Sequence, residues 1–277
     1  MPVTWEIHRR CHSLPSGWIM GVLNITPDSF SDGGRFLDAA RAVDHGLQMV
    51  ADGADVLDVG GESTRPGAES VPLPEELRRV APVIAALRGQ TKALISVDTR
   101  KPEVARAALE AGADIINDVG GMRDAAMVEV AARHDAGVIV MHMQGTPGTM
   151  QSQPHYENIV AEVREFFQQR LAQLAAAGIS QDRVALDPGI GFGKTLEHNI
   201  QLLRHLSSLR VEGRPLVLGV SRKSFIAHLL DDPAMEKRGW PTVALTTWLR
   251  EAGADVFRVH DVKENAEALR MIGAITG

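Results

Sequence analysis

Cysteine is almost absent from this sequence, because Cys11 is the only one among 277 residues. A single thiol can form neither an internal disulfide nor a cysteine-based zinc site, so both are excluded. This composition is typical of proteins from the reducing cytosol, and we expect a cytoplasmic location. The first residues, MPVTWEIHRRCHSLPSG, also lack the apolar run of a signal peptide.

Long apolar runs and a strong charge of one sign are missing as well. No stretch approaches the roughly 18 uninterrupted apolar residues of a membrane-spanning helix, so we expect no membrane partner. The formal net charge of -6 is mildly acidic, which disfavours bulk binding to nucleic acid. An anionic ligand would therefore need a local cluster of Lys and Arg.

A complete phosphate-binding P-loop is also lacking, although ALDPGIGFGKTLEHNIQLL (residues 185–203) comes close to one. A P-loop has four residues between its first Gly and its Gly-Lys pair. Counted back from Gly193, that first position is Pro188, which has no N–H to offer a phosphate. The glycine-rich turn therefore does not predict a nucleotide site.

What the sequence does contain is a recurring unit, in which a short apolar run is followed by an amphipathic helical stretch. The eight apolar runs are WIMGVLNIT, DVLDVGG, ALISVDT, DIINDVG, GVIVMHM, RVALDPG, PLVLGVS and DVFRVH. Strict alternation of strand and helix is typical of parallel strands covered by helices. We predict one (β/α)₈ barrel domain over residues 1–277, with an open doubly wound sheet as the alternative.

Polar residues gather where the predicted strands end, which is where barrel enzymes carry their active sites. They are Asn24, Glu62, Thr64, Arg65, Asp98, Asn117, His142, Asp187, Arg222, Lys223, Arg258 and His260. Carboxylates and amides in this set suit a flat, nitrogen-rich ring, because they offer acceptors and one donor group. The cationic members suit an anion. We therefore expect a pocket that holds a heterocycle on one side and a phosphate or pyrophosphate on the other.

Two of the acidic residues also have ordinary structural interpretations. Asp98 and Thr99 could cap a helix that begins near Pro102, since both are common N-cap residues. Asp187, directly before a proline, could simply start a turn. From the residues alone, these alternatives stay open.

Other polar residues favour structural roles. His142 stands between two Met residues, which favours packing in the core or a loop. Asp58, in the middle of a strand, is interpreted as a buried structural carboxylate with a local partner. Lys194 is predicted to lie on the rim of its loop without a chemical role.

Seven motifs resemble, in order, those of the dihydropteroate synthase family. They are GVLNITPDSFSDGG (21–34), GGESTRPGA (60–68), SVDTRKPEVA (96–105), INDVGG (116–121), LDPGIGFGKT (186–195), GVSRKSF (219–225) and RVHDV (258–262). Each is weak alone, but the ordered set is specific and covers nearly the whole chain. The resemblance implies a (β/α)₈ barrel that joins 6-hydroxymethyl-7,8-dihydropterin diphosphate to p-aminobenzoate, with 7,8-dihydropteroate and pyrophosphate as products. It also implies a homodimer.

The resemblance assigns roles to individual residues. The pterin would be held by Asp98, Asn117, Asp187 and Lys223, in a pocket lined by Met141, Phe192 and Gly219. The diphosphate would be held by Arg258, His260, Thr64 and Arg65, with Mg²⁺ bound to Asn24. The catalytic roles would fall to Asn24, Arg65, Lys223, Arg258 and His260. Residues 26–34 and 62–68 would form mobile loops that complete the p-aminobenzoate site.

The chain departs from the family pattern at KRGWPTVALTTW (237–248), where Trp240-Pro241 replaces Gly followed by Ser or Thr. We predict that Pro241 is the first residue of a helix, and that the change affects a subunit contact rather than the chemistry. Two alternative functions share the pterin half of the site. One is a methyltetrahydrofolate-corrinoid methyltransferase, which the diphosphate motifs disfavour. The other is an inactive pterin-binding barrel, which the intact residue set disfavours.

Overall fold

The computed structural model describes residues 3–25, 35–63, 70–146 and 148–276. Its centre is a sheet of eight parallel strands, one at each of the eight apolar runs. The strands are β3 (Trp18–Asn24), β4 (Val56–Gly60), β5 (Leu94–Asp98), β6 (Ile115–Asp118), β7 (Gly137–Met141), β8 (Val184–Asp187), β9 (Val217–Leu218) and β10 (Val256–Val259). The predicted positions of the strands are therefore confirmed.

The order of the strands shows how the barrel closes. The sheet runs β8-β7-β6-β5-β4-β3-β10-β9, so β8 and β9 are its two ends. Leu186 forms an isolated parallel bridge with Leu216, and the N–H of Leu186 donates to the carbonyl of Pro215 at 2.8 Å. These contacts join the ends into a nearly closed barrel. The barrel prediction is confirmed, and the open doubly wound sheet is excluded.

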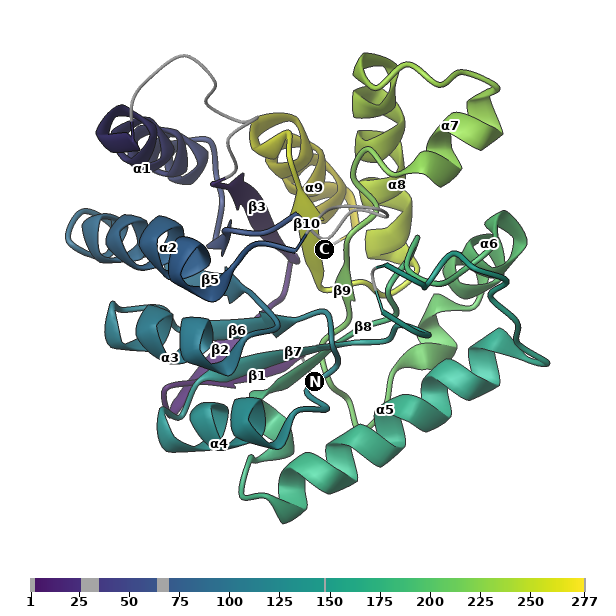
Figure 1. Ribbon diagram of the computed structural model, residues 1–277. Helices are drawn as coiled ribbons and strands as arrows, with labels where there is room; N and C mark the ends of the chain where they lie inside the picture. Colours follow the sequence, from purple (N-terminus) through teal and green to yellow (C-terminus); the bar gives the residue numbers. More distant parts are fainter. Residues whose placement is uncertain (1–2, 26–34, 64–69, 147, 277) are drawn as a thin grey trace.

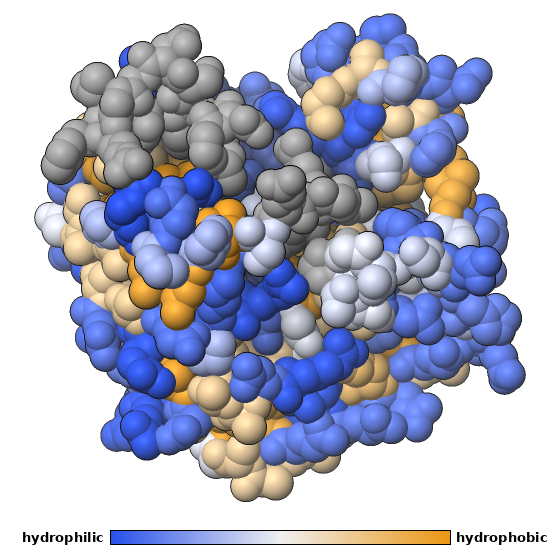
Figure 2. All heavy atoms as spheres, in the orientation of Figure 1, coloured by the Kyte–Doolittle hydropathy of each residue, from blue (hydrophilic) through white to orange (hydrophobic). Residues whose placement is uncertain are grey.

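Helices form a ring around the strands (Figure 1). They are α1 (Arg35–Ala51), α2 (Leu73–Arg88), α3 (Pro102–Glu110), α4 (Ala125–Arg133), α5 (Ile159–Ala176), α6 (Leu196–Arg204), α7 (Ser224–Leu230), α8 (Gly239–Glu251) and α9 (Val262–Thr276). None of the helices in the described parts of the chain is both long and apolar enough to cross a bilayer. Figure 2 shows that hydrophilic residues cover most of the same face, with smaller hydrophobic patches between them.

Helix α8 begins at Gly239, so Pro241 is its third residue and the prediction that it comes first is wrong. Proline is tolerated there because the N–H groups of the first turn have no partner within the helix.

A hairpin that the sequence did not reveal closes the amino-terminal end of the barrel. Strands β1 (Thr4–Ile7) and β2 (Arg10–Ser13) pair antiparallel. Trp5 and Ile7 are buried among the first interior side chains of the barrel strands, including Val56 and Val256. The indole N–H of Trp5 also donates to the carbonyl of Arg183 at 2.8 Å. This end of the barrel is therefore a packed core and leaves the opposite end for a ligand.

The alternating direction of side chains along the strands places polar side chains in the barrel interior, near the carboxyl ends of the strands. In β4, Leu57 and Val59 pack outward with the helices, whereas Val56 packs inward against the hairpin. Because successive side chains point to opposite faces, Asp58 points inward like Val56. Its hydrogen bonds to Asn117 and Arg258 agree with this direction.

Candidate active site

The register of the strands brings the predicted ligand-binding residues to one end of the barrel. Asp98 is the last residue of β5 and pairs with Asn117 of β6. Met141 is the last residue of β7 and pairs with Asp187, the last residue of β8. The sequence separates these residues widely, but the parallel register places their side chains at the carboxyl ends of neighbouring strands.

Arg258 links two of the carboxylates across the interior. Its Nε donates to Oδ2 of Asp58 at 2.6 Å, and its Nη2 donates to Oδ2 of Asp98 at 2.8 Å. Asn117 donates its amide N–H to the same Oδ2 of Asp58 at 3.2 Å. Burial alone would lower the pKa of Arg258, but the two carboxylates raise it. The guanidinium therefore stays charged and fixed in the middle of the site.

One carboxylate oxygen of Asp98 has no hydrogen-bond partner among the described residues. Burial raises the pKa of Asp98 to about 7, with Arg258 opposing and Asp58 adding to the shift. Its Oδ1 is buried and receives no hydrogen bond from any described residue. A buried acceptor without a donor costs free energy, so this atom marks a position where a ligand N–H would be stabilised.

Asp187 and Lys223 form a second polar edge. The Oδ1 of Asp187 accepts the N–H of Gly189 at 2.7 Å, and burial raises the pKa of Asp187 against the opposing charge of Lys223. Lys223 donates to the carbonyl of Ile190, and its Nζ lies 4.4 Å from the centroid of the Phe192 ring. Burial lowers the pKa of Lys223 to about 7. Charged groups and an aromatic face thus border the same space.

An apolar wall completes that space. Met141, Met143 and Met150 pack together with Val119, and the ring of Phe192 packs against them. Methionine side chains are flexible and polarisable, so they adapt well to an aromatic surface. The wall and the polar edges together suit a flat ring with hydrogen-bonding edges.

A cavity of about 380 Å³ opens above these residues and is lined by Asn24, Phe192, Gly219, Lys223, Arg258 and His260, among others. Ser221 orients His260, because its Oγ lies 3.0 Å from Nδ1 and accepts the backbone N–H of His260 at 3.2 Å. Several cations therefore face a single hollow, which favours an anionic ligand there.

Comparison with known proteins agrees with this geometry. A family model described as pterin binding enzyme matches residues 20–260. The dihydropteroate synthase of Synechocystis sp. is 46% identical over 259 residues, which cover 93% of this chain and 90% of the relative. The chain belongs to the dihydropteroate synthase family of pterin-binding enzymes.

Solved structures of dihydropteroate synthases have the same fold. The enzyme from Xanthomonas albilineans with 4-aminobenzoic acid has a TM-score of 0.93 and 44% identity, covering 100% of this chain and 99% of its own. The enzyme from Yersinia pestis in a sulfonamide drug complex has a TM-score of 0.91 and 42% identity, covering 99% and 98%. The resemblance inferred from the seven motifs is therefore confirmed.

Most of the residues that the dihydropteroate synthase motifs predicted come together. Asn24, Phe192, Gly219, Lys223, Arg258 and His260 line the cavity. Asp98, Asn117, Met141 and Asp187 are buried beside them. Thr64, Arg65 and residues 26–34 lie outside the described residues. The individual roles of all these residues stay predictions.

Neither Asp98 nor Thr99 is the N-cap residue of α3, which the sequence had left as an alternative. The N-cap position belongs to Lys101, whose side chain makes no capping bond. Asp187 does start a turn through its bond to Gly189, which confirms the turn interpretation, whereas its role towards a ligand stays a prediction. Asp58 is fully buried, as predicted, but its partners Asn117 and Arg258 are not local, since they lie 59 and 200 residues away along the chain.

Lys194 does not lie on the loop rim, and that prediction is wrong. Its side chain is 3% exposed, and Nζ lies 3.1 Å from Nδ1 of His142 and 2.9 Å from the carbonyl of Phe192. Positive φ angles at Gly189 and Gly193 fold the turn back on the end of β7, which buries the lysine. His142 packs edge-on against Phe166 with ring centroids 5.0 Å apart, which confirms its packing role.

Some functional residues escaped the sequence argument. Ser221 orients His260, and Met150 contributes to the apolar wall. Ser221 could have been found as a member of the motif GVSRKSF (219–225), although it lies in the turn after β9. Met150 comes from a loop far along the chain from Phe192, and no periodic pattern indicates that contact.

Proposed function

We propose that this member of the family joins 6-hydroxymethyl-7,8-dihydropterin diphosphate to p-aminobenzoate and releases pyrophosphate. One observation carries the proposal. A buried carboxylate oxygen of Asp98 without a donor stands next to a cavity that is lined by Lys223, Arg258 and His260. An N–H-rich ring bearing a diphosphate carries both complementary groups in one molecule.

The pterin edge would be held by acceptors deep in the barrel. Its amino and ring N–H groups would donate to Asp98 and Asp187, and Asn117 would serve as a donor or an acceptor. Lys223 would donate to the ring oxygen, and Phe192 would cover the ring face. Charge-assisted hydrogen bonds in such a buried place are among the strongest available, so this edge would fix the orientation of the substrate.

The diphosphate would lie towards the cavity mouth, on Arg258, His260 and, by motif, Thr64 and Arg65. Arg258 is already held by two carboxylates, so it needs little rearrangement to face the developing charge. Ser221 holds the ring of His260 in place in a similar way. Preorganised cations would stabilise the pyrophosphate as its charge builds.

Mg²⁺ fits this site through the amide oxygen of Asn24, which lines the cavity. Among the described residues, no group of three His, Cys, Asp or Glu side chains could hold a metal ion. A single protein oxygen is sufficient for Mg²⁺, which keeps several waters and binds largely through substrate phosphates. When bound, the ion would neutralise part of the diphosphate charge.

The reaction would be a displacement at the methylene carbon of the pterin. The C–O bond breaks, and its electron pair leaves with pyrophosphate, while the electron-rich ring shares the positive charge on the carbon. The lone pair of the arylamine then forms the N–C bond, and the nitrogen loses one proton to solvent. No covalent enzyme intermediate is required, and Cys11 lies on β2 of the hairpin at the other end of the barrel.

The chain would act as a homodimer in the cytoplasm. Support for the dimer comes from exposed apolar side chains on α7, α8 and α9, among them Trp240 at 80% exposure and Ile275 at 74%. Large apolar side chains that stay exposed on a folded chain can mark an interface. Light scattering that gave the mass of a monomer at micromolar concentration would contradict this part of the proposal.

The test of the function is a coupled assay for pyrophosphate with both substrates, with and without Mg²⁺. We expect release that depends on p-aminobenzoate and that falls strongly when the metal is chelated. Methyl transfer from methyltetrahydrofolate without pyrophosphate release would instead indicate the methyltransferase. Pterin binding without either reaction would indicate an inactive barrel.

A further inference from the structure

Lys194 is a buried lysine whose hydrogen-bond partners among the described residues are all neutral. It stands in the turn between β8 and α6, and its side chain is 3% exposed. Its Nζ lies 3.1 Å from Nδ1 of His142 and donates to the carbonyl oxygens of His142 at 3.2 Å and Phe192 at 2.9 Å. Burial lowers the pKa of His142 to about 2, with the charge of Lys194 adding to the shift, so the ring is neutral and can accept. Three acceptors therefore face the three donors of one ammonium group.

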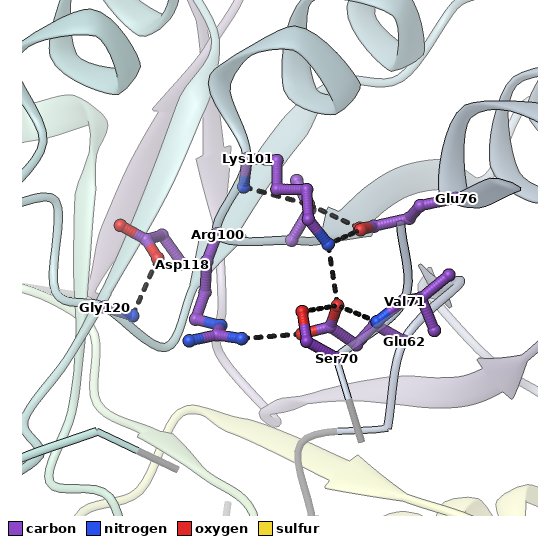
Figure 3. A network of polar contacts seen from close by, with 9 residues as sticks. Glu62, Ser70, Val71, Glu76, Arg100, Lys101, Asp118 and Gly120 are labelled. Carbon is purple, nitrogen blue, oxygen red and sulfur yellow. Dashed lines mark hydrogen bonds and ion pairs between the residues drawn. The ribbon is translucent and has the colours of Figure 1, made fainter. Parts of the chain in front are cut away.

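A second buried lysine network near the strand ends is built differently. Figure 3 shows Lys101 between the carboxylates of Glu62 and Glu76. Burial alone would lower the pKa of Lys101, but its hydrogen bonds to these carboxylates raise it. Lys194 forms no ion pair with a carboxylate in the described parts of the chain, and burial lowers its pKa to about 7. Burying such a group is costly, so charge pairing does not account for Lys194. What it provides is directed hydrogen bonds to two particular carbonyls.

The two carbonyls belong to neighbouring strand ends. His142 directly follows β7, and Phe192 lies in the glycine-rich turn after β8. Among the residues that the structure describes, Lys194 is the only donor to either carbonyl. The two backbones also pass closely here, since a Cβ on Gly189 would lie 2.0 Å from the carbonyl oxygen of His142. Without Lys194, two carbonyls would lose their partner at this contact.

Phe192 is the residue through which this contact reaches the cavity. Its ring packs against the methionine wall and lies 4.4 Å from Nζ of Lys223. The described residues that line the cavity include Phe192 but not Lys194. Lys194 is therefore bonded to the main chain of a residue that faces the ligand space, without lining that space itself.

We propose that Lys194 is a positioning residue for the pterin. By joining the carbonyl of His142 to that of Phe192, it holds the turn on the end of β7 and so fixes the aromatic ring against the substrate. This inference rests on the proposed function, in which Phe192 covers the pterin face. A neutral amine keeps two N–H groups, one for each carbonyl, so the role does not depend on the charge of Lys194.

The test measures calorimetric affinities of Lys194→Met, which keeps an unbranched side chain of similar length but has no donor. The dissociation constant of the pterin alcohol should rise by about fivefold or more, because the aromatic contact is displaced. The dissociation constant of pyrophosphate, measured with Mg²⁺, should stay within about twofold of wild type, since distant sites act independently. Arg258 and His260 are held by residues outside this turn.

Tyr156→Phe is the matched control. The hydroxyl group of Tyr156 donates to the carbonyl of Gly193 at 2.9 Å, one residue after Phe192. This variant therefore removes a hydrogen bond to the same turn but leaves the carbonyl of Phe192 bonded. Both affinities should stay as in wild type.

A double-mutant cycle with Phe192→Leu tests whether the lysine acts through the ring. In the Phe192→Leu background, Lys194→Met should change the affinity for the pterin alcohol by less than about twofold, because the ring that it positions is gone. Full additivity of the two effects would overturn the proposal. Equal losses of pterin alcohol and pyrophosphate affinity would overturn it too, because they indicate only general support of the fold.

Lys194→Gln keeps the proposal testable if Lys194→Met does not fold. Its amide retains N–H donors, but the side chain is too short to bond both carbonyls, so a smaller loss of pterin alcohol affinity is expected. Wild-type affinity in either variant would contradict the inference. A wild-type chain that does not bind the pterin alcohol would refute the proposed function, and this inference with it.

Discussion

At the scale of single residues, we propose that the carboxylates at the strand ends recognise the pterin. Replacing Asp98 or Asp187 by Ala should leave a ring N–H without its charged acceptor. We expect a loss of about 1.5–3 kcal/mol in pterin affinity for each variant, measured by calorimetry with the pterin alcohol. Unchanged affinity in both variants would mean that the ring binds elsewhere.

Arg258 lines the cavity and also bonds the buried carboxylate of Asp98, so it connects the predicted diphosphate and pterin positions. The sequence predicted that Arg258 binds the diphosphate and not the ring. In the structure, its Nη2 also donates a hydrogen bond to Oδ2 of Asp98 at 2.8 Å. Arg258→Ala should therefore weaken binding of pyrophosphate and, by a smaller factor, binding of the pterin alcohol, since Asp98 loses its counter-ion. Binding assays with each ligand separate the two effects. A pterin alcohol affinity equal to that of wild type would show that the ion pair does not matter for the ring.

Lys194 should make the stability of the protein depend on pH. Burial lowers its pKa from 10.5 to about 7, so between these values the unfolded chain binds more protons than the folded one. The free energy of unfolding should rise with pH across this window, because the cost of burying the charge is full below about 7 and is relieved above it. The difference in the free energy of unfolding between wild type and Lys194→Met should rise with a slope that approaches about 1.4 kcal/mol per pH unit.

Urea unfolding at several pH values measures that difference. The exposed Lys92→Met is the matched control and should follow the wild-type curve. Parallel curves for wild type and Lys194→Met would mean that the buried lysine does not titrate in this range.

At the scale of elements, the turn after β8 depends on its glycines. Gly189 has a φ of 67°, and a Cβ there would lie 2.0 Å from the carbonyl oxygen of His142. Gly178 has a similar φ of 86°, but a Cβ there would have no other atom within 4 Å. A substitution at Gly178 therefore measures only the cost of giving a side chain to a residue with this backbone conformation. Gly178→Ala should cost about 1–2 kcal/mol of stability.

Gly189→Ala should cost clearly more, and it should also lower pterin affinity because the displaced turn carries Phe192. Chemical denaturation and calorimetry on both variants provide the comparison. Equal costs would show that the turn tolerates the extra carbon.

At the scale of the whole molecule, the order of substrate binding follows from the proposed site. The family resemblance implies that residues 26–34 and 62–68 complete the p-aminobenzoate site only after the diphosphate is bound. We expect ordered binding with the pterin diphosphate first, and competitive inhibition by sulfonamides, which share the ring and para amine of p-aminobenzoate. Titrating a sulfonamide at several p-aminobenzoate concentrations tests this. Inhibition that excess p-aminobenzoate does not relieve would rule it out.

The sequence by itself determined the eight strands and the chemical character of their ends. Apolar runs, glycine-rich corners and polar residues at strand ends are local patterns, and local patterns report secondary structure and the direction of side chains. The ordered motifs added the family and, with it, the reaction. Asp98, Asn117 and Asp187 were predicted in this way because each lies at the end of its own strand or one residue before it.

Only the tertiary structure decided which of these residues touch. Arg258 bonds Asp58 and Asp98 across separations of 200 and 160 residues, and these contacts depend on the register of a nearly closed barrel. The burial of Lys194 depends on a turn folding back over the end of another strand. The burial of Trp5 at the amino-terminal end of the barrel depends on a hairpin that packs against strands from many parts of the chain. Such contacts are set by packing between distant segments, so no pattern within one segment encodes them.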